Sequence, residues 1–167
     1  MGALSTRNSI MNNSIVNILP KLKADFPDLL FIQGDSFFWT PGERKITYTS
    51  HQDIAEHGVW SLLHEVSHAQ LDHKTYENDF ELLKIEASAW QAAKKLGKKY
   101  AINIDLEHIQ DCLDTYRDWL HKRASCPNCS VVTIQRNDGI YQCFNCLTSW
   151  KVPRSPLCTV TKKVLSN

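Results

Sequence analysis

Two histidines four residues apart flank a glutamate in the run His64-Glu65-Val66-Ser67-His68. Residues at this spacing share one face of a helix, so the two imidazoles can converge on a single metal ion. Glu65 follows the first histidine, where its carboxylate can lie beside the metal and take a proton from a water molecule. The run predicts a catalytic metal site with His64 and His68 as ligands and Glu65 as general base. The alternative is two surface histidines with an ordinary glutamate between them.

A catalytic zinc ion takes three protein ligands and keeps one position open. A third histidine ten positions after the first would stand where the chain has Lys74, and His73 is one residue short of it. Glu86 stands in Ile85-Glu86-Ala87-Ser88-Ala89, whose small residues let two helices approach closely. On a continuous helix His73 would point about 140° away from His68. The sequence therefore favours Glu86 as the third ligand, with His73 as its rival.

Four of the six cysteines form two close pairs, Cys126-Pro-Asn-Cys129 and Cys143-Phe-Asn-Cys146. This spacing is typical of a four-thiolate zinc site, and disulfides are the alternative. A site with four protein ligands has no open position, so we expect this zinc to be structural and to hold folded a segment too short for a large core. Asn137-Asp138-Gly139 predicts the turn of a hairpin over residues 131–141. Cys112 is expected to be a small buried apolar residue, and Cys158 has no assigned role.

The segment from Thr49 to Gly97 resembles the ImmA/IrrE metallopeptidases, through the HExxH run and the later Glu86-Ala87-Ser88-Ala89-Trp90. The resemblance implies a gluzincin-type site with His64, His68 and Glu86 as zinc ligands and Glu65 as general base. It also implies that His73 lies just outside the ligand set. Ser67 stands where the family often has glycine. Family members of understood role cleave a repressor protein, so the resemblance implies a protein substrate and possible relief of transcription.

The order of elements predicts an α+β fold. The expected helices cover residues 10–26, about 50–72 with a capping box of Ser50 and Asp53, 79–96 with Gly97 as a left-handed cap, and 105–123. Three short strands, 29–33, 36–40 and 45–49, are expected to form an antiparallel meander. We expect three parts: a minimal zincin-like metallopeptidase domain over 1–123, a four-cysteine zinc ribbon over 124–152 and a basic tail over 153–167.

Charge is distributed unevenly along the chain. Residues 1–120 carry 12 basic and 17 acidic side chains, whereas residues 121–167 carry 7 and 1. A basic end is compatible with nucleic-acid binding, and a solubilising or substrate-recruiting surface is the alternative. The basic residues Arg136, Lys151 and Arg154 flank three aromatic residues of the ribbon: Tyr141, Phe144 and Trp150.

The sequence thus predicts a zinc-dependent endopeptidase that cleaves a specific intracellular protein and holds two zinc ions. No apolar run is long enough to span a membrane, and we expect a cytoplasmic protein. The alternatives are a SprT-like protease acting on DNA-associated proteins, disfavoured because no histidine lies between His73 and His108, and a non-catalytic zinc-binding module, disfavoured by Glu65. The reaction also needs a hydrogen-bond donor to the carbonyl oxygen of the substrate. Several residues are chemically suitable for this role: Tyr48, His51, Tyr76, Tyr100 and His108.

Overall fold

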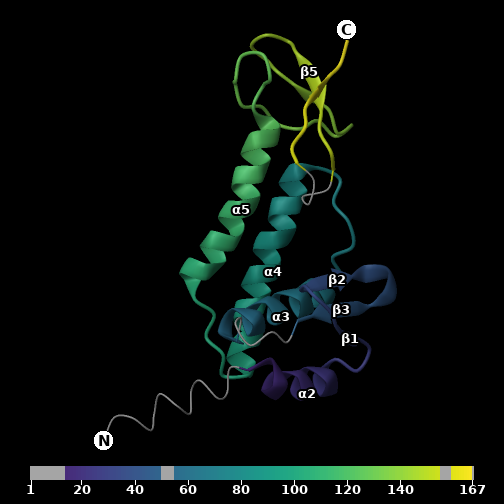
Figure 1. Cartoon of the computed structure of the whole chain (residues 1–167), viewed down its shortest axis with the longest axis vertical. Coiled ribbons are helices and arrows are strands. Elements are labelled where there is room, and N and C mark those ends of the chain that lie inside the picture. Colours follow the sequence, from purple (N-terminus) through teal and green to yellow (C-terminus); the bar gives the residue numbers. More distant parts are fainter. Residues whose placement is uncertain (1–13, 50–54, 155–158, 167) are drawn as a thin grey trace, which may run out of the picture. The chain divides into compact units, whose positions relative to one another are not determined.

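The computed structural model describes residues 14–49, 55–154 and 159–166. It is an α+β structure of helices and two small sheets, which confirms the expected class (Figure 1). Internal contacts divide the chain into two compact units, Met1–Lys74 with Ser88–Asp105 and Thr75–Ala87 with Leu106–Asn167. The expected division at residue 123 stays a prediction. No helix among the described residues combines the length and apolar character that crossing a bilayer requires.

The described part of the first unit begins with helix α2, Ile15–Asp25. Its buried residues Ile15, Ile18 and Leu22 follow the spacing of one helix face, as the sequence predicted. Pro20 lies within the helix, and the helix ends where the backbone N–H of Phe26 bonds to Leu22 O. The prediction of a short helix is confirmed for this stretch, whereas residues 10–13 lie outside the described part of the chain.

The first sheet contains β1 (Leu30–Gln33), β2 (Phe38–Thr40) and β3 (Lys45–Tyr48) in the order β1-β3-β2. The strands were expected, but the antiparallel meander was wrong, because β1 pairs with β3 in parallel. Gly34 does not turn the chain into a hairpin. Its N–H extends the pairing by bonding to Tyr48 O at 2.8 Å, and a Cβ there would lie 2.6 Å from the Thr47 methyl group. Gly34 is therefore needed for close approach of β1 to the central strand.

Helix α3, Ala55–Gln70, carries the HExxH run and packs against α2 and the sheet. One side of the helix is fully buried through Val59, Leu62, Leu63 and Val66. The predicted capping box of Ser50 and Asp53 lies outside the described residues. After Gln70 the chain turns at Asp72, whose φ is 53°, and His73 N bonds to His68 O at 3.0 Å. The helix thus ends before His73, so the rotation expected for a continuous helix does not apply to this residue.

Helix α4 runs from Asp79 to Lys99 and contributes residues to both units. The expectation that Gly97 caps it was wrong, since the helix continues and the left-handed residue is Ala101, with φ of 58°. Gly97 instead allows the chain after the helix to pass close to its backbone. The chain folds back so that Ile102 N bonds to Gly97 O at 2.9 Å, and a Cβ on Gly97 would lie 2.7 Å from Ile102 O. Here the missing side chain permits a close backbone approach.

The second unit contains α5, Leu106–Ala124, and a sheet of β4 (Tyr141–Gln142), β5 (Ser149–Lys151) and β6 (Lys163–Val164). Figure 1 shows α5 running directly into the four-cysteine segment, residues 124–152. The predicted turn is confirmed, because Gly139 has φ of 77° and Gln135 bridges Tyr141. The sequence did not predict β6, which lies in the expected basic tail and pairs with β5.

Candidate metal centres

Helices α3 and α4 contribute the first candidate metal group, His64, His68 and Glu86. One ligand atom from each residue lies within 4.8 Å of the others, and all three side chains are buried. His64 Nε2 and His68 Nε2 are 3.0 Å apart. Two imidazole nitrogens and a carboxylate oxygen are donors that zinc takes in catalytic sites. These three donors suit zinc; their assignment as its ligands stays a prediction.

The other ring nitrogen of His68, Nδ1, contacts His73. The two Nδ1 atoms are 2.9 Å apart, and His73 Nε2 lies 3.4 Å from Ser88 Oγ. If His68 Nε2 is a metal ligand, His68 must carry its proton on Nδ1 and donate it to His73 Nδ1, which leaves His73 Nε2–H to face Ser88. Trp39 Nε1 donates to His73 O at 2.8 Å and fixes the backbone of this residue. His73 therefore lies where a residue that orients a metal ligand belongs.

His64 is held by packing. Its ring stacks on Trp90 of α4, with ring centroids 4.2 Å apart and an angle of 26° between the planes. Ser67 is fully buried between the two histidines of the run, and its hydroxyl donates to Leu63 O at 2.8 Å. This bond satisfies the hydroxyl, which explains how serine is accommodated where the resembled family often has glycine. Glu65, the expected base, is half-buried on the same helix.

Several candidate donors to the reacting carbonyl oxygen have other contacts. Tyr100 donates to Asp25 at 2.6 Å, and Tyr76 donates to Arg154 O at 2.8 Å. Burial raises the pKa of both tyrosines. His108 Nε2 lies 3.6 Å from Cys112 Sγ, Tyr48 is buried, and His51 lies outside the described residues. The donor stays unassigned.

Two open cavities are present in the second unit, with volumes of about 820 Å³ and 530 Å³. The larger is lined by residues of α5 and of the stretch 159–162, and the smaller by residues that include Tyr76, Arg123 and Arg154. None of the three donors of the histidine group lines either cavity. The candidate catalytic site is therefore defined by its donor atoms.

The second candidate metal group is the predicted set Cys126, Cys129, Cys143 and Cys146. Sγ atoms from opposite pairs lie 3.5 Å apart, for Cys126 with Cys146 and for Cys129 with Cys143. These distances exceed a disulfide bond of about 2.05 Å. Because all four cysteines are free and converge, the structure favours the metal alternative over disulfides.

The two cysteine pairs have the same backbone geometry. Ser130 N bonds to Cys126 O at 3.0 Å, and Leu147 N bonds to Cys143 O at 2.9 Å. Ser130 and Leu147 both have φ of 61°, so each pair ends in one left-handed residue. Equivalent knuckles of this kind turn two thiols toward a common point, as a four-thiolate site requires.

Local hydrogen bonds prepare two of these thiols for ionisation. The side-chain amide of Asn145 donates to Cys129 Sγ and lowers the pKa of that thiol. The hydroxyl and backbone N–H of Thr148 lower the pKa of Cys146 to about 5. The backbone N–H of Cys146 lowers the pKa of Cys143, but burial and the neighbouring sulfurs together raise it to about 11. A cation is needed for all four to ionise together.

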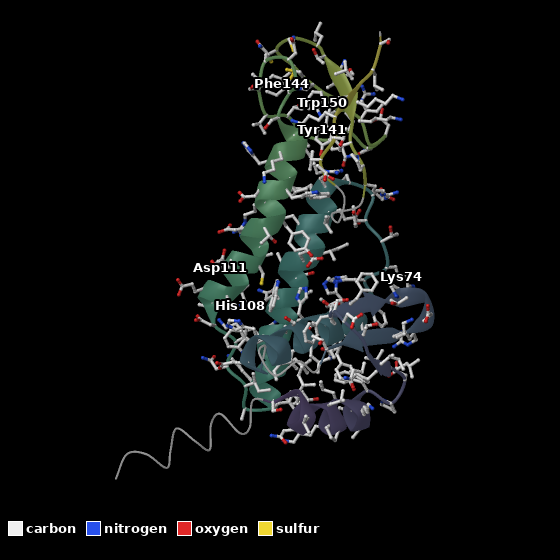
Figure 2. The ribbon with its side chains drawn as sticks, in the orientation of Figure 1. Lys74, His108, Asp111, Tyr141, Phe144 and Trp150 are labelled. Atoms are coloured by element: carbon white, nitrogen blue, oxygen red, sulfur yellow. The ribbon has the colours of Figure 1, made fainter. Side chains whose placement is uncertain are left out.

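Two of the three aromatic residues in the four-cysteine segment form its core. Tyr141 and Trp150 are buried and stack with centroids 5.3 Å apart and planes 9° from parallel. Phe144 is 72% exposed and lies in the turn between Cys143 and Cys146 (Figure 2). Only Phe144 of the three therefore presents a ring to a partner.

A buried ion pair, which the sequence did not reveal, links the start of α4 to this core. Arg123 Nε and Nη2 donate to the two carboxylate oxygens of Asp79 at 2.8 and 2.9 Å, and the Tyr141 hydroxyl donates to the same carboxylate. Trp150 Nε1 donates to Arg123 O at 3.0 Å. In the sequence, Asp79 is an ordinary acidic residue of a first helical turn and Arg123 an ordinary basic residue of a last turn. Because the two residues are 44 positions apart, no local sequence pattern predicts that they pair.

Cys112 was expected to be a buried apolar residue, and the structure shows it half-buried on α5. Burial raises the pKa of its thiol, and the negative charges of Asp111 and Glu86 add to this effect. The thiol form of Cys112 is therefore favoured.

Comparison of the chain with protein-family models, with curated proteins and with solved structures finds no match in any of the three. The likeness to the ImmA/IrrE metallopeptidases stays a prediction, carried by the motif residues.

Proposed function

We propose that the chain is a zinc-dependent endopeptidase whose catalytic metal is held by His64, His68 and Glu86. The observation that carries this proposal is the convergence of the two Nε2 atoms at 3.0 Å beside a buried carboxylate, with His68 oriented from behind by His73. Three protein donors with a hydrogen-bonded histidine are the arrangement of catalytic zinc sites.

A bound zinc ion would supply Lewis-acid chemistry, lowering the pKa of a water ligand and polarising the scissile carbonyl. Glu65 is the residue that moves the proton. Its carboxylate accepts a proton from the attacking water and passes it to the nitrogen of the leaving amine. His73 keeps the His68 proton on Nδ1, so that His68 Nε2 stays available as a ligand.

The four-cysteine segment holds a second, structural zinc ion in this proposal and forms a zinc ribbon. The substrate class follows from the family likeness: one intracellular protein or a few, such as a transcriptional repressor.

The proposal is tested by comparing cells that express the native chain with cells that express Glu65→Gln. Glutamine has nearly the size of glutamate but cannot accept the proton, so the variant keeps its metal and loses cleavage. New protein N-termini are then labelled and identified in both cell lines. We expect N-termini that depend on the native chain; an identical set in both lines, with equal protein and zinc content, contradicts the proposal.

A further inference from the structure

Within the described part of the chain, one side of the sheet of the four-cysteine segment is exposed. Tyr141, Cys143 and Trp150 are buried, whereas the alternate residues Gln142 and Lys151 are exposed. Side chains alternate between the two faces of a strand, so the buried and exposed residues mark an inner and an outer face. We define the outer face by six exposed residues of the sheet, its knuckle and the adjoining strand-like stretch: Val132, Ile134, Phe144, Leu147, Lys151 and Lys163.

The register brings the apolar members of this face together. Gln135 and Tyr141 form an isolated antiparallel bridge, so the segment with Val132 and Ile134 runs beside the segment with Gln142 and Phe144. Thr133 Oγ1 donates to Gln142 O at 3.1 Å, as expected for neighbouring strands. Ile134 is 80% exposed and Phe144 is 72% exposed. Large apolar side chains gathered in this way mark interaction sites more often than isolated ones do.

The other end of the outer face carries two lysines in direct opposition. Lys151 of β5 pairs with Lys163 of β6 in the antiparallel register. Like charges directly opposite each other on a sheet are destabilising. Residues 121–167 contain one acidic residue, Asp138, which already forms an ion pair with Arg136 at 3.0 Å. Within the described residues neither lysine has a carboxylate partner, so a negatively charged ligand would relieve their repulsion.

We propose that the outer face is a docking surface for a protein segment that combines apolar and acidic side chains. The apolar end accepts aliphatic or aromatic anchors, and the lysine pair accepts carboxylates. Nucleic acid fits less well, because stacking on successive bases needs several exposed rings, and of the three aromatic residues here only Phe144 is exposed. The exposed Val132, Ile134 and Leu147 have no counterpart on a phosphodiester chain. This inference goes beyond the proposed cleavage, because it concerns binding alone.

The test uses the full zinc-loaded chain and a phage-displayed library of random peptides. Selected peptides are resynthesised with a fluorescent label, and their affinities are measured by anisotropy beside a labelled single-stranded oligothymidylate. Two variants remove the two halves of the surface, Ile134→Ser with Phe144→Ser, and Lys151→Glu with Lys163→Glu. The matched control is Val16→Ser with Lys21→Glu on α2, where Val16 is also 72% exposed.

We expect the selected peptides to be enriched in apolar and acidic residues and to bind more weakly as salt is added. Each surface variant weakens binding by about tenfold or more, and the control leaves it unchanged. Zinc content equal to that of the native chain shows that the variants are folded. Peptides without acidic enrichment, an equal loss in the control, or oligothymidylate as the only ligand sensitive to the surface variants would overturn the proposal.

Discussion

Replacing Arg123 by methionine tests the buried ion pair of the second unit. The guanidinium makes two hydrogen bonds to Asp79, and the two side chains are 2% and 10% exposed. Methionine has a similar length but carries no charge. The Asp79 carboxylate would therefore stay buried, and among the described residues the Tyr141 hydroxyl would be its remaining side-chain donor.

Removing one partner of a buried pair costs about 3–5 kcal/mol, because the other charge stays buried without compensation. The same helix provides a control pair, Arg117 with Asp114, whose side chains are 44% and 61% exposed. Exposed pairs contribute only about 0–1 kcal/mol, so Arg117→Met is expected to change little.

The free energy of unfolding is measured by urea titration of each variant with zinc in excess. With a slope of about 1–3 kcal/mol per molar urea, Arg123→Met shifts the midpoint by one molar or more. Adding Asp79→Asn to Arg123→Met removes the uncompensated charge, so part of the loss is expected to return. A loss in Arg123→Met no larger than in Arg117→Met would refute this account of the pair.

Three further predictions concern the pKa of Asp25, the close approach at Gly97 and the ligands of the histidine site. The pKa of Asp25 is lowered by the hydrogen bond from Tyr100 and then by Lys99, so Tyr100→Phe raises it. The hydrogen bond stabilises the folded chain above the ordinary aspartate pKa of about 3.9, and this stabilisation disappears as the pH falls through the lowered pKa of Asp25. Urea titrations are therefore expected to show that Tyr100→Phe loses stability only in the upper pH range, and NMR titration measures the pKa of Asp25. Gly97→Ala destabilises by about 1–3 kcal/mol through its contact with Ile102 O, whereas Gly42→Ala, with no atom within 4 Å, does not. Glu86→Ala is expected to abolish activity and tight zinc binding at the histidine site, whereas His73→Ala is expected to lower zinc affinity about 10–100-fold. Competition with a zinc chelator measures both affinities. A larger loss of zinc affinity in His73→Ala than in Glu86→Ala would contradict the assignment of the third ligand.

Local patterns in the sequence predicted most elements and both donor groups. The spacing of His64 and His68 and of the four cysteines specifies which side chains can meet, because a helix turn and a tight knuckle are local structures. Glu86 was predicted from its small neighbours on the following helix. The structure gathers these donors into two groups.

The remaining features depend on contacts between residues distant in sequence. Gly34 and Gly97 suggested a turn and a cap, whereas close approach to Thr47 and Ile102 O explains them. Turn signals identify strand ends but do not choose the neighbours of a strand, so the central place of β3 was missed. The pairing of Asp79 with Arg123 likewise has no local signature.

Elemental analysis of zinc in the purified chain during stepwise chelation tests whether both donor groups hold a metal ion. We expect two zinc ions per chain, one for each donor group. The ion of the histidine group leaves first, because a site with an open position exchanges more readily than one closed by four thiolates. A His64→Ala and His68→Ala double variant then retains only the slowly lost ion. A native chain that binds no more than one ion would contradict the account.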